Sequence, residues 1–188
     1  MGEKIVLLDE TGHATGTAPK AESHHGQTPF HLAFSSYLVN DQGKILITQR
    51  AHHKASFPSV RTNSCCGHPA PGESLREAVT RRVKTELCLE VTDLTLLLPE
   101  FVYRAEMNGV VEHEWCPVVR ARVTGEPLKD PDEVEDAVWM TWEEVQALVH
   151  DPLASPWFIQ QMQSLVPMGE PEKWPHADIS LLPPAIAW

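Results

Sequence analysis

The chain has 188 residues, of which 42% are hydrophobic and 22% are charged, and it carries a formal net charge of −11. This composition is typical of one soluble globular domain, and the acidic balance argues against a nucleic-acid partner. No apolar run reaches the roughly 18 residues of a membrane-spanning helix, and the N-terminus lacks the pattern of a signal peptide. We therefore expect a cytoplasmic protein without a membrane partner, whose cysteines are reduced thiols.

Residues 4–50 predict three strands. The strands are expected over residues 4–9, 31–40 and 44–50, and the turn at 40–43 joins the last two as a hairpin. The segment 23–72 differs in charge from the acidic remainder of the chain. It has four basic residues and one acidic residue, which gives a local charge of +3. A basic segment in an acidic protein indicates a site for a small anionic ligand, although solvated surface charges would give the same pattern.

A helix is predicted over residues 73–87, after a break at Pro69 and Pro71-Gly72. Ser74 and Glu77 at its start match a capping box. An apolar residue recurs at every fourth position along it, namely at Leu75, Val79, Val83 and Leu87. This stripe is expected to face the core.

The second half of the chain predicts strands over residues 91–98, 100–106 and 110–123, with Asn108-Gly109 as a hairpin turn. Helices are expected over 142–149 and 155–165. From residue 167 onward five prolines fall within 22 residues, so this tail is expected to wrap the surface or to be partly disordered. Strands on both sides of a helix favour an α+β or α/β sandwich around a mixed sheet.

The segment Glu112-His113-Glu114 lies in a predicted strand. The strand period of two places both carboxylates on one face and His113 on the other. Two carboxylates on a buried face are costly unless a metal ion or cations compensate them. The pattern therefore indicates a functional site, although the same face could instead be exposed to solvent.

Residues 63–69, which read NSCCGHP, contain two adjacent thiols and an imidazole. In an extended chain Cys66 and His68 share a face, while Cys65 points the other way and is expected in the core. A vicinal disulfide would be strained, so we expect free thiols.

Histidines upstream extend this set. His24 and His31 share no element by periodicity, and each alone could be an ordinary surface or core histidine. With His68 and the two carboxylates, however, they would suit a divalent ion such as Mn²⁺, Mg²⁺ or Zn²⁺. A zinc ribbon is disfavoured because its paired Cys-x-x-Cys spacing is absent from the sequence.

The predicted helix also follows the spacing of a Nudix box, a loop–helix–loop motif whose glutamates bind Mg²⁺ beside a diphosphate. The matching positions are Gly67, Glu73, Arg81 and Glu86. Arg82 and Thr85 stand where two acidic residues are expected, and Cys88 replaces a glycine. Diphosphate hydrolysis needs several carboxylates to hold metals and activate water, so these losses disfavour it. Arg82, one turn before Glu86, favours anion binding instead.

Several motifs, in order, resemble the type I isopentenyl-diphosphate Δ-isomerases over roughly residues 4–165. They are HLAFSS (31–36), TNSCCGHP (62–69), GES (72–74), YRA (103–105), EHEWCP (112–117) and SPW (155–157). The resemblance implies a Nudix-like α/β/α sandwich with a mixed β-sheet over residues 1–166, followed by a Pro-rich tail over 167–188. It also implies the interconversion of isopentenyl and dimethylallyl diphosphate in isoprenoid biosynthesis, by a metal-dependent 1,3-proton shift through a tertiary carbocation.

The resemblance further implies the roles of individual residues. Cys66 and Glu114 would exchange protons with opposite faces of the allyl unit. Tyr103 would assist Glu114, and the ring of Trp157 would stabilise the cation. A first metal ion, Mn²⁺, Zn²⁺ or Mg²⁺, would be held by His24, His31, His68, Glu112 and Glu114. A second ion, Mg²⁺ bridging to the substrate, would be held by Glu86 and the main-chain carbonyl of Cys66. The diphosphate would be held by Lys20, Arg50, Lys54 and Arg82.

Two other functions stay open from the sequence. One is a Nudix hydrolase of nucleotide diphosphates, which the residues at 82 and 85 disfavour. The other is a non-enzymatic metal-binding or structural protein, in which Cys66, Tyr103 and Trp157 would have no purpose. For the isomerase we expect a small diphosphate as the binding partner and a monomer or weak homodimer.

Overall fold

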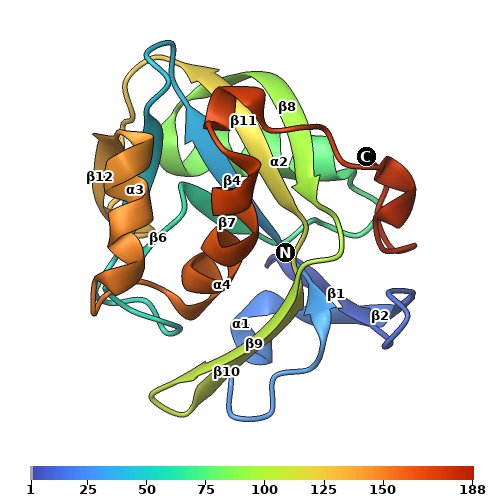
Figure 1. Cartoon of the computed structure of the whole chain (residues 1–188). Helices are drawn as coiled ribbons and strands as arrows, with labels where there is room; N and C mark the ends of the chain where they lie inside the picture. Colours follow the sequence, from blue (N-terminus) through green and yellow to red (C-terminus); the bar gives the residue numbers. More distant parts are fainter. Residues whose placement is uncertain (1) are drawn as a thin grey trace.

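A computed structural model gives the fold of the chain and describes residues 2–188. Two β-sheets form its framework (Figure 1). The larger sheet has the order β12 (Val134–Met140), β5 (Ile45–Arg50), β4 (Phe34–Val39), β11 (Val118–Thr124), β8 (Glu90–Leu98), with β6 (Arg61–Thr62) and β7 (Cys65–Gly67) paired to β5 and β4. The smaller sheet has the order β2 (Ala14–Pro19), β1 (Lys4–Leu8), β3 (His31–Leu32), β10 (Val110–Trp115), β9 (Val102–Met107).

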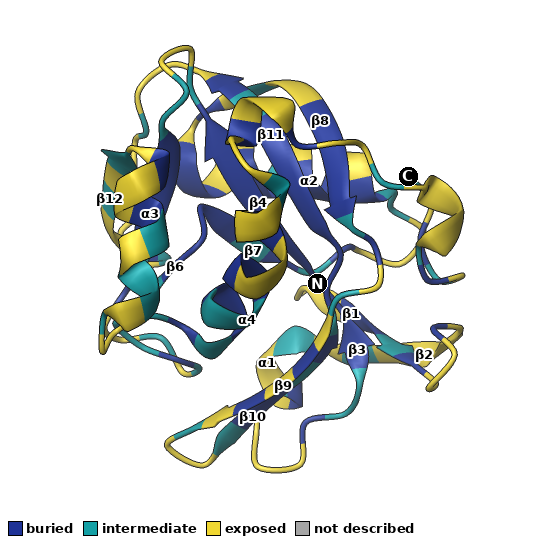
Figure 2. Ribbon diagram, in the orientation of Figure 1, coloured by how far each residue is buried: buried dark blue, intermediate teal, exposed yellow. Residues whose placement is uncertain are grey.

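Helices cover both faces of the larger sheet. One buried cluster joins the apolar stripe of α2 (Leu75–Leu87) to Phe34 and Leu38 of β4. A second joins α3 (Trp142–Ala147) and α4 (Pro156–Leu165) to Tyr37 and Val39, the alternate residues of the same strand. Figure 2 shows β4 and β11 buried between these layers. The fold is thus the expected α/β sandwich around a mixed sheet.

Local signals in the sequence placed several elements correctly. Helix α2 has the expected capping box, in which Ser74 Oγ accepts from the Glu77 N–H. Asn108 and Gly109 have φ of 53° and 79°, the left-handed pair that a two-residue hairpin needs between β9 and β10. In residues 2–188 no helix is long and apolar enough to cross a membrane.

Two predicted strands are each divided between the two sheets. Residues 31–40 form β3 and β4 with a break at Ala33, and residues 110–123 form β10 and β11 with a break before Pro117. Pro117 has no N–H for a ladder, and its carbonyl accepts from the Ser35 N–H instead, at 3.1 Å. The two segments run parallel and cross together from one sheet to the other, which makes a bend where the sheets meet.

Several short or exposed elements were not predicted from the sequence. These are β2, β6, β7, β12 and the short helix α1 (Lys20–Ser23). β2 is largely exposed and contains a glycine, and β12 contains two acidic residues within seven, so neither has a clear apolar alternation. β6 and β7 have only two and three residues, too few for any periodicity.

The C-terminal tail lies against the body of the protein. The Ala177 N–H donates to the Leu96 carbonyl at 2.8 Å, and the Ala185 N–H donates to the Gly12 carbonyl at 3.0 Å. The Ala187 carbonyl accepts from the N–H of Leu75, the first residue of α2, at 2.9 Å. Ile186 is buried in the cluster under α2. The tail was expected either to wrap the surface or to be partly disordered, and the structure shows it packed on the surface.

Candidate active site

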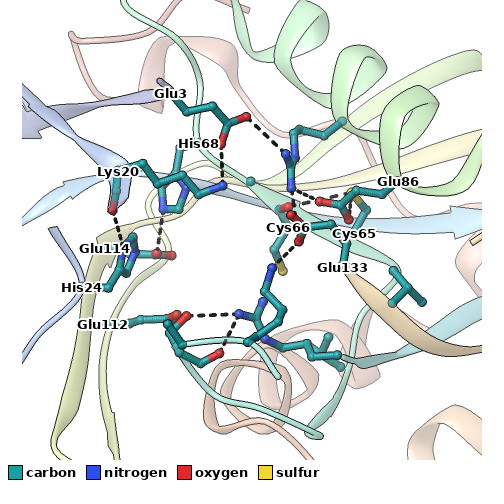
Figure 3. A pocket seen from close by; sticks show the side chains of 18 of the residues that line it. Glu3, Lys20, His24, Cys65, Cys66, His68, Glu86, Glu112, Glu114 and Glu133 are labelled. Atoms are coloured by element: carbon teal, nitrogen blue, oxygen red, sulfur yellow. Dashed lines mark hydrogen bonds and ion pairs between the residues drawn. The ribbon is translucent and has the colours of Figure 1, made fainter. Parts of the chain in front are cut away.

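A cavity of about 510 Å³ opens where the two sheets meet. It is lined by every predicted site residue except His31, which is buried beside His68. Figure 3 shows His24, His68 and Glu114 on one side of this cavity and Cys65 and Glu86 on the other. The bend in the paired strands positions the site, because β10 of the smaller sheet and β7 of the larger one both line the cavity, while β3 pairs with β10 behind it.

Three histidines and one glutamate form a compact group. The parallel pairing of β3 with β10 places His31 directly opposite Glu114. His31 Nε2 lies 3.2 Å from His68 Nε2, and both atoms lie 3.3 Å from Glu114 Oε1. With His24, the ligand atoms of the four residues all lie within 4.8 Å of one another.

This spacing fits a divalent ion. Metal–ligand distances of about 2.0–2.2 Å separate neighbouring ligand atoms by about 2.8–3.1 Å in octahedral geometry and about 3.3–3.6 Å in tetrahedral geometry. The Nδ1 atoms of His31 and His24 lie 2.8 and 3.3 Å from the carbonyls of Pro29 and Lys20, so donation there leaves the Nε2 lone pairs free. Burial lowers the pKa of His68 to about 4, which keeps that imidazole neutral and able to ligate.

Glu112 shares the buried face of β10 with Glu114, as the strand period predicted, while His113 is partly exposed. The Glu112 carboxylate is not part of the compact group of four. It accepts from the Tyr103 hydroxyl at 2.9 Å, and the same hydroxyl lies 2.8 Å from Glu114 Oε2. Burial and the neighbouring charge of Glu114 raise the pKa of Glu112. Its role as a metal ligand stays a prediction.

Cys66 faces the cavity with its thiol hydrogen-bonded. The thiol donates to Asn63 Oδ1 at 3.3 Å, and burial raises its pKa to about 11, so it is protonated at neutral pH. The same Asn63 oxygen accepts from Trp157 Nε1 at 3.2 Å. No predicted role included Asn63, although a polar residue three positions from a predicted reactive thiol was a usable signal. Trp157 is buried, with its ring centroid 5.6 Å from that of Tyr103.

Cys65 points away from Cys66, as the alternation predicted. It belongs to the core cluster under α2, and its thiol donates to Glu86 Oε2 at 3.4 Å. All four cysteines are free thiols. The Arg82 side chain packs closely against the main chain at Gly67. A Cβ atom at residue 67 would lie only 2.8 Å from Arg82 Cγ. A glycine at this position therefore allows Arg82 to reach the cavity.

The four predicted diphosphate-binding cations, Lys20, Arg50, Lys54 and Arg82, form what we call the cationic cradle. Arg82 pairs with Glu86 one turn later on α2, as expected. Arg50 is engaged with the loop 51–60, since its Nε donates to the Phe57 carbonyl at 3.1 Å and its Nη2 to the Ser56 carbonyl at 2.8 Å. It lines the cavity but is held by main-chain acceptors.

Two carboxylates that were not predicted from the sequence, those of Glu3 and Glu133, also belong to this region. Glu3 Oε2 lies 2.6 Å from Lys20 Nζ, and Glu3 Oε1 lies 3.3 Å from Arg82 Nη1. Glu133 pairs with Lys54 and lies 3.7 Å from Arg82 Nη2. Neither glutamate lies in a motif, and their contacts join segments far apart in the chain, so no local pattern marked them.

Comparison with known proteins decides the family. Residues 29–160 match the model of the NUDIX domain. An isopentenyl-diphosphate Delta-isomerase of Mycolicibacterium vanbaalenii is 52% identical over 169 residues, which cover 89% of this chain and 93% of the relative. A protein of the same name from Saccharopolyspora erythraea is 50% identical and covers 97% and 96%. The chain belongs to the isopentenyl-diphosphate Delta-isomerase family.

Solved structures support the fold of this isomerase family member. A Deinococcus radiodurans protein has a TM-score of 0.63 and 21% identity, covering 81% of this chain and 92% of its own. A MutT NUDIX hydrolase from Burkholderia pseudomallei has a TM-score of 0.57 and 24% identity, covering 72% and 98%. These likenesses concern the Nudix fold alone.

Membership in this family excludes one alternative left open by the sequence, a non-enzymatic metal-binding or structural protein. The chain is an enzyme rather than a non-enzymatic binding protein. The isomerase family implies the use of a divalent metal, and the group of His24, His31, His68 and Glu114 is suited to hold one.

Proposed function

We propose that the enzyme interconverts isopentenyl diphosphate and dimethylallyl diphosphate by a metal-dependent 1,3-proton shift through a tertiary carbocation, as a step of isoprenoid biosynthesis. The relatives named for this reaction support the substrate. The observation that carries the mechanism is the meeting of a thiol, Cys66, and a carboxylate, Glu114, in one cavity walled by the rings of Tyr103 and Trp157.

In the proposed reaction Cys66 and Glu114 form the proton-transfer pair. Protonation of an unactivated alkene needs a proton donor in a site that excludes water, and both residues are largely buried. The Tyr103 hydroxyl, 2.8 Å from Glu114 Oε2, would hold that carboxylate in place and share its proton. The buried ring of Trp157 would stabilise the carbocation by a cation–π interaction of about 2 kcal/mol in a desolvated site.

The proposed metal ligands are His24, His31, His68, Glu112 and Glu114. A bound Mn²⁺, Zn²⁺ or Mg²⁺ would supply positive charge that fixes the Glu114 carboxylate and perturbs its proton affinity. Glu86 and the main-chain carbonyl of Cys66 would hold Mg²⁺ at the substrate diphosphate, since this ion is usually held by one or two carboxylates plus substrate phosphates. The cationic cradle would bind the diphosphate oxygens.

Metal removal tests this proposal. Dialysis against EDTA is expected to lower isomerisation by roughly 100-fold or more, because the metal holds Glu114 for proton transfer. Mg²⁺ with Mn²⁺ or Zn²⁺ should restore it. Elemental analysis is expected to find one tightly bound ion per chain, lost in the variant His68→Ala. Full turnover in metal-free protein would contradict the proposal.

The same proposal keeps the remaining expectations. They are a cytoplasmic location, a monomer or weak homodimer, and a division into an isomerase domain over residues 1–166 and a tail over 167–188. Hydrolysis of nucleotide diphosphates has no observation in its favour, since Arg82 occupies a position where a hydrolase would need a carboxylate.

A further inference from the structure

Glu133 places a negative charge beside Lys54 and Arg82, two cations of the cationic cradle. Its carboxylate pairs with Lys54 and lies 3.7 Å from Arg82 Nη2, so it contacts two of the four cations. It lines the same cavity as Glu86, and its charge contributes to the raised pKa of Glu86, whose main cause is burial. A carboxylate here competes directly with an incoming anion for the same two cations.

The main chain holds Glu133 in this position. Its N–H donates to the Asp130 carbonyl at 3.1 Å, and its carbonyl accepts from the Ala51 N–H at 3.0 Å. The side chain is only 25% exposed. Glu3, by contrast, is 50% exposed and lies near the N-terminus, so it can turn into solvent more readily. A diphosphate that enters the cradle therefore meets the charge of Glu133.

The charge balance indicates what this carboxylate does. Lys20, Lys54 and Arg82 pair with the carboxylates of Glu3, Glu133 and Glu86. The charge of Arg50 acts on the carboxylate of Glu112, so the four cations of the cradle are balanced by four carboxylates. An alkyl diphosphate carries about three negative charges near neutral pH, because its last phosphate proton dissociates with a pKa of about 6. A free diphosphate would thus leave about three uncompensated negative charges, and one that carries a divalent cation would leave about one.

We propose that Glu133 is a specificity-determining residue that makes the cradle select a metal-complexed diphosphate over a free one. This inference rests on the proposed function of the cradle. Glu133 repels a bare diphosphate by occupying Lys54 and Arg82, whereas a divalent cation bound to the diphosphate offsets that repulsion. The selection acts at binding, before any proton transfer.

The test is calorimetric titration with inorganic diphosphate, with and without added Mg²⁺, on protein as purified. The metal content of the protein is measured before and after, so that the resident ion stays constant. For the unchanged protein we expect at least tenfold tighter binding with Mg²⁺. In Glu133→Gln, removal of one opposing charge is expected to tighten Mg²⁺-free binding roughly tenfold, which largely removes the Mg²⁺ preference.

Two further variants separate charge from structure. Glu133→Asp retains the charge and should keep the Mg²⁺ preference within about threefold of the unchanged protein, whereas a purely structural role would affect both variants alike. Glu135→Gln is the matched control, because Glu135 lies two residues away, is exposed and pairs with His52 outside the cavity. It should change neither affinity.

The titrations test the role of Glu133 separately from diphosphate binding by the cradle. If the unchanged protein binds Mg²⁺-diphosphate but Glu133→Gln keeps the same Mg²⁺ preference, the role of Glu133 is wrong and the cradle stands. If the unchanged protein binds inorganic diphosphate under neither condition, the cradle itself is wrong, and this inference falls with it.

Discussion

At the scale of single residues, Cys65 and Cys66 show how adjacent side chains acquire different chemistry. Cys65 packs in the core under α2, whereas the Cys66 thiol faces the cavity and donates to Asn63 Oδ1. Strand alternation alone predicted this division. The alternation could not predict Glu3 or Glu133, because their ion pairs join segments that come together only in the fold. Asn63 lies three residues from Cys66, but its contact with Trp157 also forms only in the fold.

The thiol gives the sharpest residue-scale prediction. Cys66→Ala removes one member of the proton-transfer pair and is expected to lower kcat by roughly 10³-fold, the range for loss of a general acid or base. The circular dichroism spectrum should not change, since only one small side chain is lost. Turnover of isopentenyl diphosphate by purified protein is the measurement.

The control is Cys88→Ala, which removes the exposed thiol outside the cavity and should leave kcat unchanged. Near-normal turnover in Cys66→Ala would show that the thiol takes no part in proton transfer.

At the scale of elements, helix α2 connects the core to the site. Its buried stripe packs on the larger sheet, and Arg82 and Glu86 project into the cavity. The helix and its capping box were predictable because these signals are local. The breaks at Ala33 and before Pro117 were not predicted, since each apolar segment continues through the break and only pairing across the sheets reveals it.

The residue that ends α2, Cys88, has a strained backbone conformation. Cys88 caps the helix with φ of 55°, a left-handed conformation that costs a residue with a Cβ atom about 1 kcal/mol relative to glycine. Cys88→Gly is therefore expected to raise the free energy of unfolding by about 1 kcal/mol in urea titration. Cys88→Ala keeps the Cβ atom and should bring no such gain. Equal stability of the two variants would contradict this origin of the strain.

At the scale of the whole molecule, the site depends on the meeting of two sheets. β3 and β10 are about eighty residues apart in sequence, yet their pairing places His31 beside Glu114. The motifs allowed the sequence analysis to list the residues that would meet, but not the bend that brings them together. The path of the tail was open for the same reason, since its contacts with Gly12, Leu75 and Leu96 are all long-range.

The tail is predicted to stabilise the whole fold. Deletion of residues 175–188 exposes the surface that Ile186 covers and removes the carbonyl that accepts from the first N–H of α2. We expect a loss of at least about 3 kcal/mol, because the deletion removes Ile186, the packing of Leu182 and Trp188 on the same cluster, and a few hydrogen bonds. The milder variant Ile186→Ala should lose about 2 kcal/mol. An unchanged urea midpoint in both variants would show that the tail contributes nothing to stability.

The central claim is that this cavity moves protons on an isoprenoid diphosphate. The most direct measurement follows isopentenyl diphosphate by proton NMR in D₂O with the metal-loaded enzyme. We predict conversion to dimethylallyl diphosphate, with deuterium entering the new methyl group because the proton donor exchanges with solvent. Release of phosphate without any allylic isomer, or no turnover by folded and metal-loaded protein, would contradict the account.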